Sequence, residues 1–466
     1  MRICAILAAA AASAGAAMLP HVEQVGRGVW AAGFDAKRQW ANCGFVAAAD
    51  GALLIDPPRG IGAREYVAEV ERISGKRPAG FLLTSDALPT QELTSLGVRK
   101  LEAHPAVEIL PYDKGRRAIF VKASKTMFAG PAVVNGPRAD VTAHDTVAWL
   151  DMLALIDSRR PESVVPGQGS WGGAQLIARQ RRFLTELRRQ VAYAITMGRP
   201  MDAIVAEFLL PASYYTWMPY DLPQPADLKH VYAELTAPRA PFRELAAGKP
   251  NALVLIGDRF HEPEHLEAGL RPALEAAGVK PHFTVDVAAL TAANLARVDL
   301  LVILRDGMLW PGGPSKPYTI WMTPEQEKAV VDFVEGGKAF LILHNSMGLY
   351  PEKGPYLNLA GGRYIGHGPL ERFRVEVVDR DHPVTRGVSD WSAADEQHTP
   401  PLDRKEATLL LRNRSDQGTT AAAGWAYEPG RGRLVHLASG HTREALEHSM
   451  YQRLLRNSVG WLLRRE

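Results

Sequence analysis

Histidine residues in the second half of the chain follow short apolar runs, at wide intervals along the sequence. His261 follows the run at 252–256, His344 the run at 339–343 and His441 the run at 433–437. If these runs are parallel strands, their carboxyl ends meet at one edge of a sheet and the three imidazoles lie close together. A single histidine at such a position is more often structural, but three together indicate a metal centre or an acid–base centre.

Two later segments carry compatible chemistry. His367 closes a glycine-rich run at 361–367, and two adjacent carboxylates, Asp395 and Glu396, precede His398. Carboxylates and imidazoles together bind divalent cations or exchange protons. The resulting predictions assign catalysis to His344, Asp395 and Glu396, and binding of one divalent metal ion to His261, His367 and His441.

Polar and aromatic residues near the same predicted edge are candidates for substrate binding. Asp258 follows the first apolar run and Arg305 follows a later one, while Trp310 and Tyr356 lie in segments rich in proline and glycine. Aromatic faces in such loops can stack on the apolar faces of sugar rings, or they anchor the loops by burial. We predict that these four side chains bind the substrate, and the burial alternative stays open.

The elements that would position these residues follow a regular order. Apolar runs at 252–256, 282–285, 300–304, 339–343 and 433–437 alternate with helical patterns at 264–277, 324–334 and 448–463. Strands that alternate with helices predict a parallel, doubly wound sheet. The candidate site therefore belongs to an α/β domain.

The length of 466 residues favours two domains. Residues 236–250 contain three prolines among alanines and glycine, which is typical of a linker. Upstream of it, the patterns predict a hairpin at 46–55, a helix at 61–73, a buried strand at 80–83, weaker strands at 108–110 and 118–121, and helices at 147–157 and 175–197. The predicted organisation is a first domain at 20–235, the linker, and a second domain at 251–466.

The segments 42–45, 53–56, 81–84 and 164–169 of the first domain resemble the metallo-β-lactamase superfamily. The resemblance implies an αβ/βα sandwich. In that family a run of His-x-His-x-Asp-His follows the threonine that is Thr84 here, and a later histidine corresponds to Gln168. This chain has Ser85, Ala87, Pro89 and Thr90 at the ligand positions of the run. We therefore expect no metal cofactor and no catalysis in the first domain, and no metallo-β-lactamase activity.

The second domain resembles the ThuA-like family, which is named for trehalose utilisation. The matching segments are 343–344, 361–367, 381–385, 395–396, 425, 430–433 and 440–441. The resemblance implies a flavodoxin-like fold related to class I glutamine amidotransferases, and a role in carbohydrate metabolism. His398 stands where the family has a tyrosine, so a role of that tyrosine does not transfer. Glutaminase chemistry is excluded because the domain has no cysteine.

Composition limits the partners. The formal net charge of +3 is nearly neutral for this length and gives no support for nucleic-acid binding. Residues 1–17 have an arginine, an apolar run and small residues, which predicts a signal peptide and a periplasmic or secreted protein. That run is too short to span a bilayer, so we expect no transmembrane segment. Nothing in the sequence indicates the oligomeric state.

Two functions fit these observations. The first is an exported enzyme of carbohydrate metabolism, a hydrolase, lyase or isomerase, that acts on a sugar or an oxidised sugar at the histidine and carboxylate centre of its second domain. The second is a non-catalytic module that binds a glycan or a protein. A first domain without its metal ligands favours the second function, and the converging histidines favour the first.

Overall fold

A computed structural model describes residues 21–33, 41–59, 62–113, 115–136, 139–208, 225–236, 242 and 245–465. The predicted signal peptide at 1–17 and part of the predicted linker lie outside the described residues. The chain divides into two compact units, of which the first covers residues up to 186 and 210–227, and the second covers 187–209 and 228–466. The predicted domain boundaries stay predictions.

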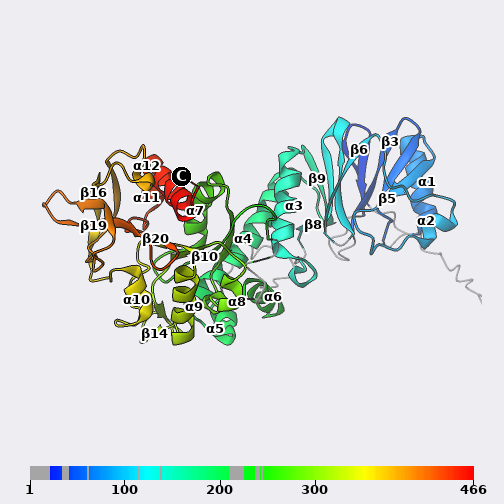
Figure 1. The fold of residues 1–466 in the computed structure, drawn as a ribbon. Helices are drawn as coiled ribbons and strands as arrows, with labels where there is room; N and C mark the ends of the chain where they lie inside the picture. The colour runs from blue at the N-terminus through cyan, green and yellow to red at the C-terminus, as the bar shows by residue number, and fades with distance from the viewer. Residues whose placement is uncertain are drawn as a thin grey trace, which may run out of the picture. The chain divides into compact units, whose positions relative to one another are not determined.

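The first unit contains two sheets (Figure 1). One has five strands in sequential order: β1 (Val22–Gly26), β2 (Val29–Ala32), β3 (Cys43–Ala48), β4 (Gly51–Ile55) and β5 (Pro78–Leu82). The other has four: β6 (Val107–Asp113), β7 (Arg116–Val121), β8 (Thr126–Asn135) and β9 (Ser163–Gly169). The predicted hairpin is confirmed as the antiparallel pair β3–β4, whereas β8 was not predicted.

Successive side chains along a strand point to opposite faces of the sheet, and this alternation explains the layers of the first unit. Leu53 and Ile55 of β4 pack with Ile119 and Phe128 of the other sheet, so the two sheets enclose a common core. Leu54 points to the opposite face and packs with α1 (Ala63–Ser74) and α2 (Gln91–Ser95). Helix α3 (Thr146–Ser158) contacts β6 and β8. Helices outside two facing sheets make the predicted αβ/βα sandwich.

The second unit is built on a nine-stranded sheet. Its parallel part has the order β11 (Lys280–Thr284), β10 (Asn251–Ile256), β12 (Leu300–Leu304), β15 (Ala339–Leu343) and β20 (Arg433–Leu437). This is the strand order of flavodoxin-like folds, as predicted. Every residue of β10, β12 and β15 is buried because helices cover both faces of the sheet.

Alternate residues of the strands face different helices. Val254 of β10 packs with Leu270 of α7 (Pro263–Ala276) and Leu454 of α12 (Ser449–Leu462). Its neighbour Leu255 packs on the other face with Val330 of α9 (Pro324–Glu335). The smaller elements are α8 (Ala292–Leu295), α10 (Pro355–Ala360), α11 (Arg443–Glu447) and the pair β13 (Met308–Leu309) and β14 (Thr319–Ile320).

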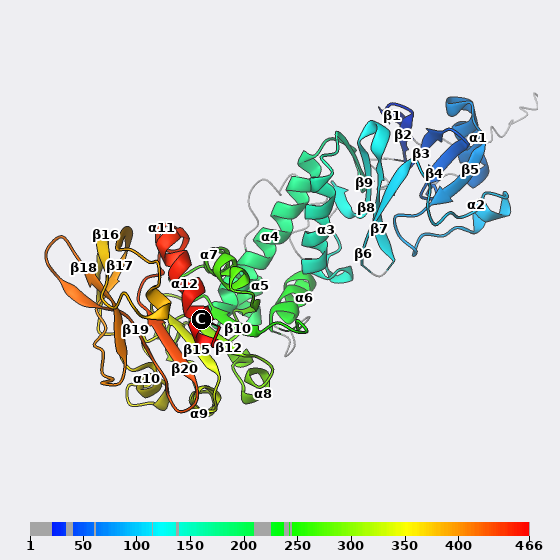
Figure 2. The ribbon, with the colours of Figure 1, turned by 45° about the horizontal axis from the view of Figure 1, so that its top comes forward.

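The prediction of a wholly parallel sheet was incomplete. Four antiparallel strands continue the sheet beyond β20: β19 (Thr420–Tyr427), β18 (Thr408–Arg414), β16 (His367–Val377) and β17 (Trp391–His398). Figure 2 shows them in yellow and orange at one edge of the sheet. Several of these strands alternate polar and apolar residues because one face is solvated, and this weaker signal was not recognised.

Helix α4 (Gln175–Thr196) runs from the first unit into the second, and α5 (Met201–Glu207) belongs to the second unit. Helix α6 (Pro225–Thr236) lies almost wholly in the second unit. None of the helices in the described part of the chain is long and apolar enough to cross a membrane.

Candidate metal centre

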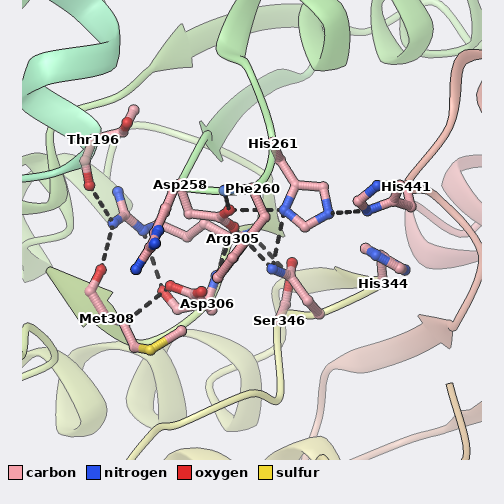
Figure 3. A network of polar contacts seen from close by, with 12 residues as sticks. Thr196, Asp258, Phe260, His261, Arg305, Asp306, Met308, His344, Ser346 and His441 are labelled. Carbon is pink, nitrogen blue, oxygen red and sulfur yellow. Dashed lines mark hydrogen bonds and ion pairs between the residues drawn. The ribbon is translucent and has the colours of Figure 1, made fainter. Parts of the chain in front are cut away.

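The ends of three parallel strands and one antiparallel strand bring four potential ligands together in the second unit. His261 follows β10, His344 follows β15, His441 follows β20, and Glu396 lies on β17. One ligand atom from each of the four lies within 4.8 Å of the other three. Figure 3 shows the rings of His261, His344 and His441 next to one another. The predicted convergence of the three histidines is therefore confirmed.

Asp258 orients the ring of His261. The Nδ1–H of His261 donates to Asp258 Oδ1 over 2.8 Å, so Nε2 is the ring nitrogen that faces the centre. Burial raises the pKa of the Asp258 carboxyl, but His261 and the hydrogen bond from Asn345 outweigh it and hold this pKa well below its usual range. An ionised carboxylate behind a histidine is the usual support of a metal ligand.

His344 has a backbone conformation that few residues with a side chain adopt, with φ 50°. Its Nδ1–H donates to Ala438 O over 2.9 Å. Its buried Nε2 has no hydrogen-bond partner among the described residues and lies 3.5 Å from Glu396 Oε2. A buried nitrogen without a partner is costly, unless a ligand that is not part of the chain satisfies it.

Asp395 positions the loop that carries His441. Its carboxylate accepts hydrogen bonds from the backbone N–H groups of Gly440, His441 and Thr442 at 2.9, 2.9 and 3.3 Å. Asp395 and Glu396 are adjacent on a strand and therefore point to opposite faces. The two carboxylates predicted as catalytic thus have different places, with Asp395 behind the centre and Glu396 inside it.

The carboxylate of Glu396 is surrounded by imidazoles. Its Oε2 lies 3.4 Å from His441 Nδ1, 3.4 Å from His398 Nε2 and 3.8 Å from His367 Nε2. Burial raises the pKa of Glu396, but the contacts with His344, His398 and His441 outweigh it, so the pKa lies far below the usual range. Glu396 is therefore ionised at neutral pH.

Two of these imidazoles are neutral at pH 7. Burial lowers the pKa of His398 to about 3, and the neighbouring His344 lowers it further. Burial also lowers the pKa of His441 to about 4, helped by His261. Neutral imidazole is the form that binds metal ions, so burial prepares both rings for coordination.

His367 does not belong to the group around His261. It forms a second group with His398 and Glu396, in which the ligand atoms again lie within 4.8 Å of one another. The first group contains His344 and Glu396, which were predicted to be catalytic. The structure therefore offers His261, His344, Glu396 and His441 as one ligand set, and the catalytic roles stay predictions.

The predicted substrate-binding residues have different environments. Arg305 and Tyr356 are fully buried. The guanidinium of Arg305 donates to Thr196 O and Met308 O, and the hydroxyl of Tyr356 donates to Ser346 O. Contacts of this kind are typical of structural residues. For Tyr356 this is the burial alternative stated above. We therefore do not include Arg305 or Tyr356 in the site.

The other two predicted substrate-binding residues differ from this pair. Asp258 is buried behind His261 and acts on the centre through it. Trp310 is half-buried, and the guanidinium carbon of Arg259 lies 4.4 Å from its ring centroid. Trp310 therefore remains a candidate for substrate contact.

The sequence predictions named His398 beside the two carboxylates without assigning it to the site, and they did not name Asn345 as a candidate. His398 faces Glu396 from the same side of β17, two positions along the strand. Asn345 donates to Asp258 Oδ2 over 2.8 Å. A strand assigned at 391–398 would have placed Glu396 and His398 on one face, but no local signal marks Asn345.

In the first unit, two aspartates close to the former ligand positions make other contacts. Asp86 pairs with Arg117 over 2.6 Å and with Lys100 over 3.4 Å. Asp56 accepts hydrogen bonds from the backbone N–H and the hydroxyl of Thr84, both over 2.6 Å. Both metal-compatible groups of the described residues lie in the second unit.

Residues 251–462 match the family model of ThuA, described as trehalose utilisation. The second domain is therefore a ThuA domain. A solved ThuA-like protein from Parabacteroides merdae is 16% identical over 46% of this chain and 90% of its own, with a TM-score of 0.39. One from Bacteroides uniformis is 18% identical over 47% of this chain and 95% of its own, with a TM-score of 0.37.

The N-terminal part is similar to solved metallo-β-lactamases. The enzyme from Erythrobacter litoralis is 13% identical over 35% of this chain and 92% of its own, with a TM-score of 0.31. The assignment of the first unit to an αβ/βα sandwich is based on its own strand order and packing. None of the curated proteins compared with the chain matches it.

Proposed function

We propose that the ThuA domain binds a divalent transition metal ion through His261, His344, Glu396 and His441, and that this centre acts on a sugar or an oxidised sugar. The observation that carries the proposal is the convergence of four ligand atoms within 4.8 Å, from four separate strands. Three imidazoles and one carboxylate form a ligand set typical of zinc and related metals.

The hydrogen bonds made by the other ring nitrogens of the ligand histidines support the proposal that a metal ion binds here. Asp258 accepts the Nδ1–H of His261, and Ala438 O accepts the Nδ1–H of His344. Each partner fixes the tautomer that leaves Nε2 free to coordinate. His441 Nδ1 and His261 Nε2 lie only 3.0 Å apart. Two nitrogen lone pairs at this distance repel each other unless a proton or a metal ion lies between them.

The description of the matched family supports a carbohydrate substrate. A bound metal ion acts as a Lewis acid that polarises a carbonyl or hydroxyl oxygen. Asp258 and Asp395 then act as positioning residues, because they hold His261 and the His441 loop in place. A hydrolase, a lyase and an isomerase are all compatible with this chemistry.

We include export in the proposal. The composition of residues 1–17 supports a periplasmic or secreted location. Sequencing of the N-terminus of the protein from the periplasm or medium tests it. An uncleaved N-terminus on protein confined to the cytoplasm refutes it.

The test of the metal centre uses the full chain, purified without chelators, and its His344→Ala variant. We expect at least one equivalent of zinc, manganese or iron per chain, and a loss of affinity of more than about tenfold in the variant. His382→Ala is the matched control, because His382 caps a turn of the same domain through Val384 N. A metal-free protein that stays metal-free on titration overturns the proposal.

The reaction is tested by incubating the same proteins with trehalose, other disaccharides and their keto derivatives. We expect turnover that is lost in His344→Ala and retained in His382→Ala. Thermal stabilisation by a sugar without turnover instead identifies a glycan-binding module. The first unit favours that alternative, because its former ligand positions carry no histidine and the neighbouring Asp86 and Asp56 are engaged in an ion pair and a hydrogen bond.

A further inference from the structure

A second group of ligands lies beside the proposed metal centre. His367 begins β16 and His398 ends β17, and the two residues are cross-strand partners in the antiparallel ladder. Their rings are stacked, with centroids 5.2 Å apart. Both rings approach Glu396 Oε2 through Nε2, at 3.8 and 3.4 Å. The sheet itself therefore fixes this second group.

The tautomer of His367 is set by the backbone. Its Nδ1 lies 2.6 Å from Gly368 O, which only accepts hydrogen bonds, so Nδ1 carries the proton. Nε2 is then the ring nitrogen that faces the carboxylate of Glu396. His344 presents its Nε2 to the same carboxylate, for the same reason, from the other group.

Both groups therefore direct ring nitrogens toward one shared carboxylate, which is an arrangement that a bound cation stabilises. A single ion bound to His261, His344 and His441 occupies the first group only and leaves the ligand atoms of His367 and His398 unused. His367 and His398 approach Oε2 at distances too long for strong hydrogen bonds. His367 Nε2 is too far from Oε2 for a hydrogen bond, and His398 Nε2 makes only a long one, over 3.4 Å.

We propose that His367 and His398 bind a second divalent metal ion and that Glu396 bridges the two ions. This dinuclear centre rests on the proposed function of the first group. A carboxylate shared by two ligand groups is well suited to link two ions, one through each oxygen or both through one. His398 is buried, whereas the side chain of His367 is 33% exposed, so the second ion lies on the solvent side.

The proposal narrows the class of substrate. Two neighbouring ions bind two neighbouring oxygen atoms of one ligand better than a single hydroxyl. A sugar with a carbonyl beside a hydroxyl, or with two vicinal hydroxyls, offers such a pair. The centre therefore favours oxidised sugars and cis-diols over sugars that lack an accessible oxygen pair.

The experiment measures metal stoichiometry on the full chain. The protein is stripped with a chelator, titrated with Zn²⁺ or Mn²⁺, and analysed by native mass spectrometry and elemental analysis. We expect two ions per chain in the natural protein, one in His367→Ala and two in His382→Ala. His367 is suited to substitution because it is partly exposed and lies at the end of a strand.

The failures of the two proposals are distinguishable. One ion per chain, unchanged in His367→Ala, overturns the dinuclear centre and leaves the proposed single-metal function intact. Binding of no ion overturns both. A second measurement needs no variant: Co²⁺-loaded protein gives a spin-coupled electron paramagnetic resonance signal if two ions share Glu396. An uncoupled signal from fully loaded protein contradicts the bridge.

Discussion

Asp258→Asn tests the reasoning about ligand orientation. The carboxylate of Asp258 accepts four hydrogen bonds and is fully buried. Oδ1 accepts from Phe260 N and His261 Nδ1, each over 2.8 Å. Oδ2 accepts from Asp306 N over 3.1 Å and from Asn345 Nδ2 over 2.8 Å. Asparagine has nearly the same shape, so the substitution removes the charge and one acceptor without leaving a cavity.

The expected losses of stability and of metal affinity in Asp258→Asn follow from these four hydrogen bonds. The variant can keep its oxygen toward His261 and turn its NH₂ group toward Asp306 and Asn345. Asn345 can rotate its amide, because its Oδ1 has no hydrogen-bond partner among the described residues. The N–H of Asp306 then remains as one buried donor without an acceptor, which costs about 1–3 kcal/mol of stability. Without the carboxylate, His261 becomes a weaker ligand, and metal affinity falls by about 10–100-fold.

The assay is competition for Zn²⁺ or Mn²⁺ against a chromophoric chelator, combined with urea unfolding. Asp299→Asn is the matched control, because Asp299 precedes β12 at the opposite end of the same strands and accepts from Asn251 N over 3.1 Å. We expect the control to change stability without changing metal affinity. Equal metal affinities of the natural protein and Asp258→Asn would refute the orienting role.

Two further predictions concern the backbone and a buried acid. Gly440 has φ +146°, and a Cβ there would lie 3.2 Å from the Cβ of His344. We expect Gly440→Ala to lose about 1–3 kcal/mol of stability and to weaken metal binding, as measured by thermal unfolding and titration. Unchanged values would show that the loop relaxes freely. Burial raises the pKa of Asp56 from 3.8 to about 6, against the hydrogen bonds from Thr84. Because the folded pKa is the higher one, this stability term is fully present below pH 3.8 and is lost as pH rises through about 6, by about 3 kcal/mol. Asp56→Asn should abolish this loss, as followed by hydrogen exchange in β5 during urea titration at pH 4 and pH 7. The same pH dependence in the variant would assign it to other groups.

The match between predicted and observed site depends on the type of strand. His261, His344 and His441 were predicted because β10, β15 and β20 are parallel and fully or almost fully buried. Each of these strands is therefore a continuous apolar run, and the end of the run marks the end of the strand. His398 was named but not assigned to the site, because β17 is an antiparallel strand whose ladder with β16 cannot be read from local composition. The separation of Asp395 from Glu396 follows from the same unassigned strand.

The aromatic and basic candidates show a different limit. Tyr356 and Arg305 have residue types that suit a sugar site, but both are fully buried in the structure. Whether such a side chain faces solvent or the core depends on which segments pack over it. Tyr356 lies in helix α10 and its ring is buried in the interior of the domain, where its centroid is 6.0 Å from that of Phe340.

The sequence by itself determined the alternation of strands and helices, the two-domain organisation and the replaced ligand positions after Thr84. These are local properties, set by hydrophobic periodicity and residue identity. Only the tertiary structure decided that Glu396 lies among the imidazoles while Asp395 holds the neighbouring loop. It also decided that the histidines form two ligand groups that share one carboxylate. Those outcomes depend on strand register and on contacts between residues that are mostly far apart in the sequence, such as the 46 positions between Asp395 and His441 and the 180 between His261 and His441, which no local pattern specifies.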